Sequence, residues 1–170
     1  MKECQKKVKN ILAICWGLQV AVTAAGGEVK KSKGAHIGIA NELIINDEGL
    51  KHPLYKDKKN NFNTPAFNFD EVVTLPENGV CLASNKINKV QGMYFKINNN
   101  NVWGLQYHPE ITYQKMIQLI KFRKDRLIET RKVFANHDQV DEHISFIEKE
   151  ISISDNQQRM IELKNWLNSI

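Results

Sequence analysis

The sequence predicts an α/β protein, and three patterns along its 170 residues support this class. A short apolar run at residues 11–14 is typical of a strand buried on both faces of a parallel sheet. A tight turn and a small apolar helix follow it, and several short strand-like segments bounded by Gly, Pro or Asn come later. After Thr112 the apolar residues repeat at helical spacing. We therefore expect strands and helices that share one core.

The predicted elements follow one another along the chain. The strand at 11–14 leads into a helix over residues 18–25, which Gly26-Gly27 ends. Residues 28–65 mix short β-prone pieces with a polar run and predict short strands and a surface loop. Further strands are predicted at residues 71–74, 80–83, 90–95 and 102–107.

Three helical patterns make up the C-terminal part of the chain. They carry, in order, Met116, Leu119, Ile120 and Leu127; Val140, Ile144, Ile147 and Ile151; and Met160, Leu163 and Leu167 after a Ser154-Asp155 cap. We expect residues 1–129 to form the α/β domain and residues 130–170 to form a helical C-terminal extension. The apolar face of that extension could pack on the domain or on a partner.

Composition excludes several classes of protein. Hydrophobic residues make up 42% and charged residues 25%, so collagenous, disordered and disulfide-scaffold proteins are excluded. No run approaches the roughly 18 apolar residues of a membrane span, and the first residues lack the apolar stretch of a signal peptide. We expect a cytoplasmic protein with no membrane partner.

The net charge of +5 comes mainly from lysine, since only four of the basic residues are arginine. Nucleic-acid binding favours arginine clustered with aromatic residues, and the sequence shows no such cluster. We expect no nucleic-acid partner. The three cysteines are odd in number and lack the spacing of metal ligands, so neither a disulfide framework nor a metal site is expected.

Cys15 stands where a nucleophile would stand. It follows the buried strand, and Gly17 comes two residues later. A sharp turn from strand to helix presents such a side chain at the carboxyl end of a sheet, where helix amides can lower a thiol pKa and receive an oxyanion. An isolated cysteine at this place is more often a small core residue. Cys4 and Cys81 have no comparable context.

His108-Pro109-Glu110 follows another apolar strand and supplies the partners that a nucleophile needs. The histidine could point out of the same edge of the sheet as Cys15. Glu110, held by a rigid proline, could accept a hydrogen bond from the imidazole and fix its tautomer. Taken alone, a His-Pro-Glu segment is usually a turn, and its combination with the Cys15 turn makes the pattern specific.

These segments together resemble the class I glutamine amidotransferases. The family has a Gly-hydrophobic-Cys-x-Gly-x-Gln motif, a Gly-Gly after the following helix, and a final Gln-x-His-Pro-Glu. Over about residues 10–125 the matching segments are Ile14-Cys15-Trp16-Gly17-Leu18-Gln19, Gly26-Gly27-Glu28-Val29, Leu75-Pro76, Leu82-Ala83-Ser84 and Trp103-Gly104-Leu105-Gln106-Tyr107-His108-Pro109-Glu110. The resemblance implies an open, mostly parallel, flavodoxin-like sheet with helices on both faces.

The resemblance also implies a chemistry. Cys15 would attack the side-chain amide of glutamine, His108 would carry the proton to ammonia, and Glu110 would hold His108. Water would then hydrolyse a glutamyl thioester. The implied substrate-binding residues are Trp16, Gly17, Gln19 and Asn68, with the Trp16 amide as an oxyanion donor. No cofactor is implied.

The chain departs from the family pattern at three places. Ala13 stands where the family usually has glycine, and Asn68-Phe69-Asp70 stands where it often has His-x-Asp beside bound glutamine. Fourteen residues precede Cys15, fewer than in family members. The sequence therefore predicts a domain without its first strands and without a second oxyanion amide, whose loss lowers rates by about 100- to 1000-fold.

Several functions remain open at this point. An active enzyme would release ammonia to a synthase subunit, or it would be a free-standing hydrolase of γ-glutamyl amides. A catalytically inactive remnant would instead use the face of residues 140–151 as a docking surface. A third hypothesis is a split domain, in which an N-terminal complementing chain supplies the first strands.

Overall fold

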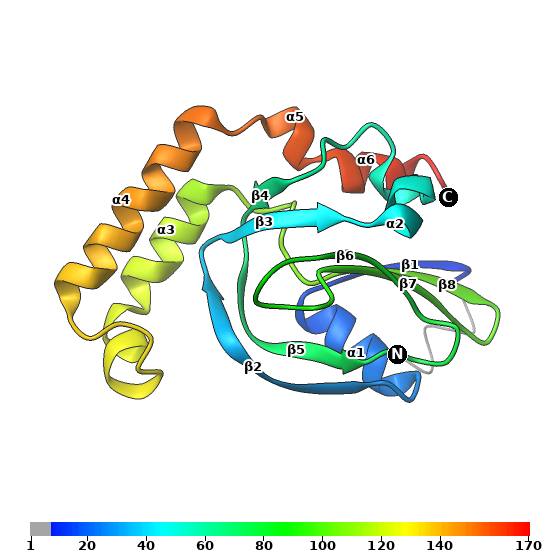
Figure 1. Cartoon of the computed structure of the whole chain (residues 1–170), viewed down its shortest axis with the longest axis horizontal. Helices are drawn as coiled ribbons and strands as arrows, with labels where there is room; N and C mark the ends of the chain where they lie inside the picture. Colours follow the sequence, from blue (N-terminus) through cyan, green and yellow to red (C-terminus); the bar gives the residue numbers. More distant parts are fainter. Residues whose placement is uncertain (1–7) are drawn as a thin grey trace.

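A computed structural model describes residues 8–170, and its centre is a six-stranded sheet in the order β1-β8-β7-β6-β3-β4. A second, two-stranded sheet pairs β2 with β5 and curls around one side of the first (Figure 1). The strands are β1 (Asn10–Ile14), β2 (Glu28–Ile37), β3 (Ala40–Ile45), β4 (Phe62–Thr64), β5 (Phe67–Thr74), β6 (Val80–Ser84), β7 (Gly92–Ile97) and β8 (Asn100–Leu105). The predicted strands at 11–14, 71–74, 80–83, 90–95 and 102–107 correspond to β1, β5, β6, β7 and β8.

The prediction of a mostly parallel sheet is wrong for the described residues. β1 runs parallel to β8, but every other pair in the six-stranded sheet is antiparallel. For β6, β7 and β8 the reason is their short connections, because strands joined by a few residues can pair only antiparallel. The turn between β7 and β8 is two residues long, and Asn98 takes a positive φ of 54° there.

Helices cover both faces of the sheet. The helices are α1 (Trp16–Ala24), α2 (Asp47–Lys51), α3 (Tyr113–Phe122), α4 (His137–Ile153), α5 (Asn156–Arg159) and α6 (Ile161–Leu167), with a 3-10 turn η2 (Pro53–Tyr55) and a π-helix η3 (Arg126–Thr130). Alternate side chains of β1 serve the two faces: Ala13 packs in the cluster that holds α1, and Leu12 packs in the cluster that holds η2.

α3 and α4 form an antiparallel pair at one end of the molecule (Figure 1). The Thr112 side chain caps α3 by accepting a hydrogen bond from the Lys115 amide. The apolar face predicted at Val140, Ile144 and Ile147 is buried in one cluster with Ile117 and Ile120 of α3. That face therefore packs on its own chain.

The last predicted helix is interrupted at Met160 and forms α5 and α6, with Asp155 as the cap of α5. α6 lies against η2, and Glu162 of α6 is fully buried. Its carboxylate lies 3.0 Å from Nζ of Lys58 and accepts a hydrogen bond from the Tyr107 hydroxyl at 2.6 Å. The C-terminal helices thus contact the sheet core, and a domain division at residue 129 stays a prediction.

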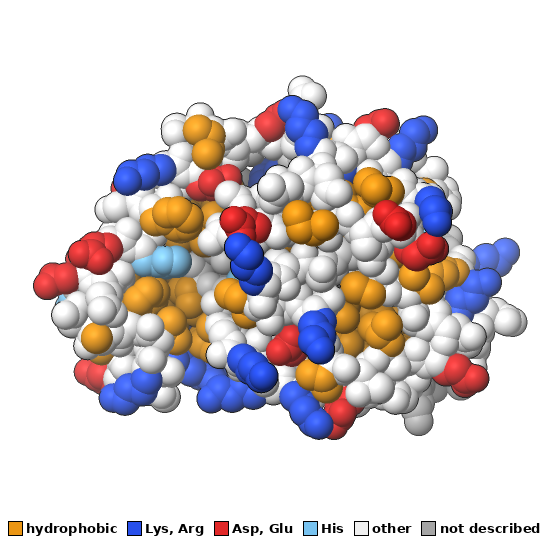
Figure 2. Space-filling view, in the orientation of Figure 1, with side chains coloured by type: hydrophobic (Ala, Val, Ile, Leu, Met, Phe, Trp, Pro, Cys, Tyr) orange, Lys and Arg blue, Asp and Glu red, His pale blue; other side chains and the backbone are white. Residues whose placement is uncertain are grey.

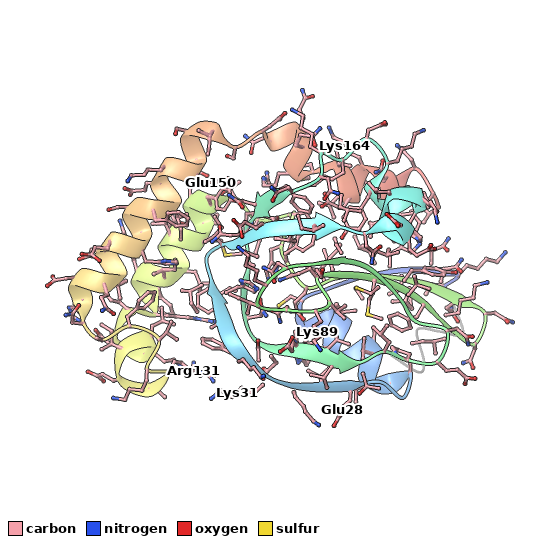
Figure 3. The ribbon with its side chains drawn as sticks, in the orientation of Figure 1. Glu28, Lys31, Lys89, Arg131, Glu150 and Lys164 are labelled. Carbon is pink, nitrogen blue, oxygen red and sulfur yellow. The ribbon has the colours of Figure 1, made fainter. Side chains whose placement is uncertain are left out.

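Basic and acidic side chains are spread over the face drawn in Figure 2, several basic ones lie together along its lower edge, and apolar groups form separate patches. The labelled Glu28 and Lys31 of β2 and Lys164 of α6 project outward (Figure 3). No helix within residues 8–170 is both long and apolar enough to span a bilayer.

Candidate active site

Cys15 lies in a strained turn between β1 and α1. Its φ of 51° and ψ of −110° fall in a region that residues other than glycine rarely adopt, at a cost of about 1–3 kcal/mol. The Cys15 amide donates to the Leu105 carbonyl at 2.7 Å, and the Cys15 carbonyl accepts from the Gln19 amide at 3.1 Å. These bonds hold the thiol at the carboxyl end of β1, before the first amides of α1.

The parallel pairing of β1 with β8 brings His108 to the same edge of the sheet. Ile14 pairs with Leu105, so the residues after both strands leave the sheet side by side. The His108 amide donates to the Pro65 carbonyl at 2.8 Å, and Nδ1 of His108 lies 2.6 Å from Oε1 of Glu110. This contact leaves Nε2 of the imidazole for the thiol.

The surroundings of His108 favour its charged form. Burial opposes the charge, but side-chain hydrogen bonds with Cys15 and Glu110, together with their negative charges, raise the pKa of His108 to about 9. A histidine that stays protonated beside a thiol stabilises the thiolate, which is the nucleophilic form of cysteine. The geometry therefore places a thiol beside an imidazolium that a carboxylate holds.

The turn that carries His108 and Glu110 is supported by the fourth arginine of the chain. The Arg159 guanidinium, from α5, donates to the backbone carbonyls of Pro109 and Ile111. A residue of the predicted C-terminal extension thus fixes the backbone beside the histidine.

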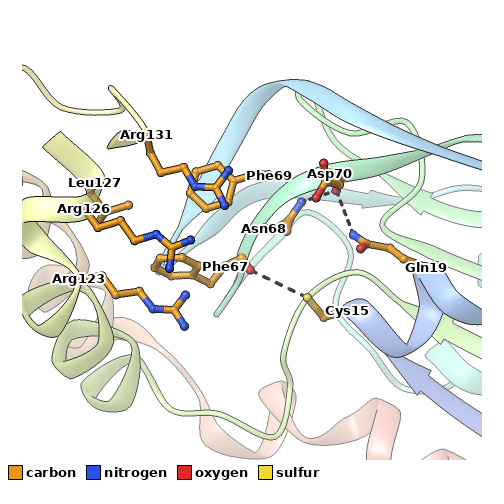
Figure 4. A pocket seen from close by; sticks show the side chains of 10 residues that line it. All are labelled: Cys15, Gln19, Phe67, Asn68, Phe69, Asp70, Arg123, Arg126, Leu127 and Arg131. Atoms are coloured by element: carbon orange, nitrogen blue, oxygen red, sulfur yellow. Dashed lines mark hydrogen bonds between the residues drawn. The ribbon is translucent and has the colours of Figure 1, made fainter. Parts of the chain in front are cut away.

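A pocket of about 170 Å³ opens beside Cys15 (Figure 4). Gln19 and Asn68, both predicted to bind substrate, line it together with Asp70. Nε2 of Gln19 donates to the Asp70 carbonyl and to Oε1 of Gln106, each at 3.3 Å. The structure thus brings Cys15, Gln19 and Asn68 to one cavity, with His108 beside the thiol.

Asn68 offers an open acceptor in this pocket. Its side chain is 4% exposed, and Nδ2 donates to the Asp70 carbonyl at 3.1 Å. Its Oδ1 atom is buried and has no hydrogen-bond partner within residues 8–170. A buried polar atom without a partner carries a free-energy cost of about 1–3 kcal/mol, which a bound donor would relieve.

Trp16 and Gly17 contribute differently from the other predicted residues. Neither lines the pocket, and the Trp16 side chain is 75% exposed. Both occupy the first turn of α1, where backbone amides have no partner inside the helix. Space beside the α-carbon of Gly17 is open to 4 Å. What both residues present at the start of α1 is therefore their backbone amides.

The sequence reasoning missed three arginines. Arg123, Arg126 and Arg131 line the pocket opposite Cys15 (Figure 4), and the guanidinium groups of Arg123 and Arg131 lie 5.2 and 4.4 Å from the ring centres of Phe67 and Phe69. Arginine and aromatic residues that form no cluster in the sequence thus come together in the structure. The available signal was the concentration of three of the four arginines within nine residues.

The remaining cysteines and histidines lie elsewhere. Cys81 is a half-buried residue of β6 whose burial raises its pKa, and Cys4 lies outside the described residues. His36 is buried, with Nε2 2.9 Å from Nε2 of Gln91, and it belongs to the core. The part of the chain that the structure describes holds no group of three metal-ligating acids, cysteines or histidines.

Comparison with known proteins identifies the family to which this chain belongs. The model of the family described as glutamine amidotransferase class-I matches residues 1–124. The chain belongs to the class I glutamine amidotransferases. This family membership confirms the resemblance of the sequence motifs.

Two curated relatives of this class I amidotransferase chain share about a third of their residues with it. A γ-glutamyl-L-1-hydroxyisopropylamide hydrolase of Pseudomonas sp. is 36% identical over 106 residues, which are 60% of this chain and 36% of that protein. One subunit of a glutamine-hydrolysing GMP synthase of Sulfolobus acidocaldarius is 33% identical over 115 residues, which are 65% of this chain and 56% of that protein. The chain thus spans less than two thirds of the length of either relative.

Solved structures support the fold. A glutamine amidotransferase of Thermotoga maritima superposes with a TM-score of 0.68, covering 99% of this chain and 64% of that one, at 18% identity. At this identity the likeness concerns the fold alone. It confirms the predicted α/β class of this amidotransferase chain, apart from the strand directions corrected above.

Proposed function

We propose that this chain hydrolyses a γ-glutamyl amide, in the first instance glutamine, through a thioester on Cys15. The observation that carries the proposal is the strained Cys15 turn beside a histidine that Glu110 holds at 2.6 Å. Membership of the class I glutamine amidotransferases supports glutamine as the amide.

Cys15, the amides at the start of α1 and His108 each carry out one part of the proposed reaction. The Cys15 sulfur attacks the γ-carbonyl carbon, and backbone amides at the start of α1, including that of Trp16, stabilise the oxyanion. The carbon–nitrogen bond then breaks, and the proton of the His108 imidazolium goes to the leaving nitrogen. Water attacks the thioester, His108 takes a proton from it, and glutamate leaves.

The pocket supplies contacts for the amino acid end of the substrate. Oδ1 of Asn68 and the carboxylate of Asp70 are acceptors suited to an α-ammonium group. Gln19 stands between Asp70 and Cys15 and is placed to contact the side-chain amide. Glu110 acts as a positioning residue because it reaches the substrate only through His108.

The fate of the leaving amine is part of the same proposal. In a glutamine-hydrolysing enzyme ammonia would pass to an acceptor on another chain, and the similarity to one subunit of a GMP synthase supports such a partner. The similarity to a γ-glutamyl amide hydrolase supports a second candidate, a hydrolase that needs no acceptor. Both functions use the same thioester.

The test is ammonia release from glutamine by the purified chain and by Cys15→Ala. We expect turnover that falls by at least roughly 10³-fold in the variant, because the covalent route depends on the thiol. Cys81→Ala is the matched control, since it removes another half-buried free cysteine and should leave turnover unchanged.

A second readout separates an inactive remnant from an active enzyme. A glutamine-like electrophile should alkylate Cys15 faster than Cys81, as measured by peptide mass spectrometry of the folded chain. Equal labelling of both thiols, together with no ammonia from a chain that circular dichroism shows to be folded, would contradict the proposal.

A further inference from the structure

The three pocket arginines have no role in the hydrolysis of glutamine described above. Arg123 ends α3, Arg126 begins η3, and Arg131 follows it, so the irregular end of this helical segment presents all three to one cavity. The π-helix sets the spacing of Arg126 and Arg131, because the Arg131 amide donates to the Arg126 carbonyl, five residues back, at 2.9 Å.

No acidic side chain in the described part of the chain neutralises their charges. Within residues 8–170 none of the three forms an ion pair with an acidic side chain, and the Arg126 guanidinium has no hydrogen-bond partner there. Arg123 and Arg131 instead lie over the rings of Phe67 and Phe69, which hold guanidinium planes without satisfying their donors. The pocket therefore offers many free N–H donors to an anion.

The pocket carries more positive charge than the α-amino acid group of glutamine can neutralise. An α-amino acid group carries one ammonium and one carboxylate, and it needs one acidic and one basic partner. Asp70 is the one carboxylate among the described lining residues, whereas three guanidinium groups face it. After an α-amino acid group is bound, the lining keeps an excess of positive charge.

Resting on the proposed function, we propose that the preferred substrate is a γ-glutamyl amide whose amine half carries a carboxylate, and that Arg123, Arg126 and Arg131 select it. A γ-glutamyl amino acid is the simplest such compound. Its second carboxylate supplies the anion that the arginines lack, and guanidinium groups bind carboxylates in a planar, two-bond geometry.

The chemistry remains balanced with this substrate. The sulfur of Cys15 bonds to the γ-carbonyl carbon, the bond to the amino acid nitrogen breaks, and the proton from His108 goes to that nitrogen. Water then releases glutamate from the thioester and returns a proton to His108. Each cycle consumes one water and yields glutamate and one free amino acid.

The test compares two substrates that differ in one charge, γ-glutamylglycine and γ-glutamylglycinamide. We expect kcat/KM to be at least roughly tenfold higher for the acid, because each charge-assisted hydrogen bond contributes about this factor. Arg126→Gln should lower that ratio about tenfold, and Arg126→Lys should restore part of it. Added salt should also lower the ratio.

Lys121→Gln is the matched control. It removes one positive charge from an exposed position of α3, the helix that Arg123 ends, and Lys121 does not line the pocket. The acid-to-amide ratio should stay unchanged in this variant. An equal fall in both variants would mean that general electrostatic attraction, rather than the arginine site, favours the acid, and would overturn the proposal.

Binding measured on Cys15→Ala by calorimetry separates this proposal from the proposed function. Tighter binding of the acid, lost in the added Arg126→Gln change, would support the arginine site even if no substrate were hydrolysed. Hydrolysis with a ratio near one would overturn the arginine site and leave the thioester function intact. An arginine change that weakens glutamine, acid and amide equally would also overturn it, since it would assign the arginines to the common glutamyl carboxylate.

Discussion

Tyr107 and His108 are neighbours at the end of β8, but they join polar clusters of opposite kinds. The Tyr107 hydroxyl is buried, donates to Glu162 at 2.6 Å and lies 3.0 Å from the Tyr55 hydroxyl, and Lys58 completes the cluster. There each charge meets its counter-charge inside the chain. His108 instead lies beside Cys15, whose pocket is lined by three arginines that have no acidic partner within residues 8–170.

The two clusters therefore have different roles: the paired cluster stabilises the fold, and the open cluster is available for chemistry. A buried cluster that is fully paired stabilises the fold and leaves nothing for a ligand, and burial raises the pKa of Tyr55 and Tyr107 well above the usual value. An open cluster with unpaired donors and a strained nucleophile costs free energy until something binds. Single changes in the two clusters should therefore affect different properties.

Glu110→Gln should give the largest effect, and in the open cluster. Glutamine keeps the shape of the side chain but removes the charge beside Nδ1 of His108, so the imidazolium is less stable and the tautomer is less fixed. We expect kcat to fall by roughly 10²- to 10⁴-fold. Stopped assays of glutamine or γ-glutamylglycine hydrolysis would measure it, with the exposed Glu77→Gln as control.

The same variant has a pH signature. The pKa of His108 is raised from 6.5 to about 9, so its favourable contribution to folding is fully present below pH 6.5 and is lost as pH rises through about 9. In Glu110→Gln the folded-state pKa should be lower, so the decline should be smaller and should end at lower pH, although it still begins near pH 6.5. Proton NMR of the imidazole would report the pKa, and an unchanged value would contradict the positioning role.

Much of this arrangement follows from the sequence. The apolar run before Cys15 and the one before His108 predict two strands, and the resemblance to the family puts their ends together. The parallel pairing of β1 and β8 does so in the structure. The sequence prediction does not give the antiparallel directions of β6, β7 and β8. It takes the buried strand before Cys15 as the sign of a parallel sheet and gives less weight to the short connections between the later strands.

Other features depend on contacts that no local pattern encodes. Glu162 lies on a helix that the sequence treats as an extension, and its partners Lys58 and Tyr107 are 104 and 55 residues away. The arginine pocket likewise joins the end of α3 to β5, and a helix periodicity does not reveal where a π-helix will turn its side chains. Tertiary packing decides both.

Glu162→Gln tests the paired cluster. The change leaves Lys58 buried without its counter-charge, although burial already lowers the pKa of Lys58. Breaking one side of a buried ion pair costs about 3–5 kcal/mol of unfolding free energy. Urea unfolding would measure the loss, whereas Glu48→Gln, in the exposed pair with Lys51, should change stability by less than about 1 kcal/mol. A Glu162 change that lowered kcat without lowering stability would erase the distinction between the clusters.

Gly38→Ala should have the smallest effect. It tests whether the contact between Gly38, which lies between β2 and β3, and the helices α3 and α4 keeps these helices in position. Gly38 has a φ of 83°, and an added Cβ would lie 2.7 Å from the Cδ1 atoms of both Ile120 and Ile147. We expect a loss of about 1–3 kcal/mol, from backbone strain and displaced side chains together. Because Ile120 is on α3, three residues before Arg123, the displacement should also reduce the preference for γ-glutamylglycine over its amide while ammonia release from glutamine changes little.

Gly26→Ala is the control, since Gly26 has a similar φ of 85° but open space around it, so it should lose stability without losing the substrate preference. Equal preferences in the two variants would mean that the position of α3 does not depend on this contact.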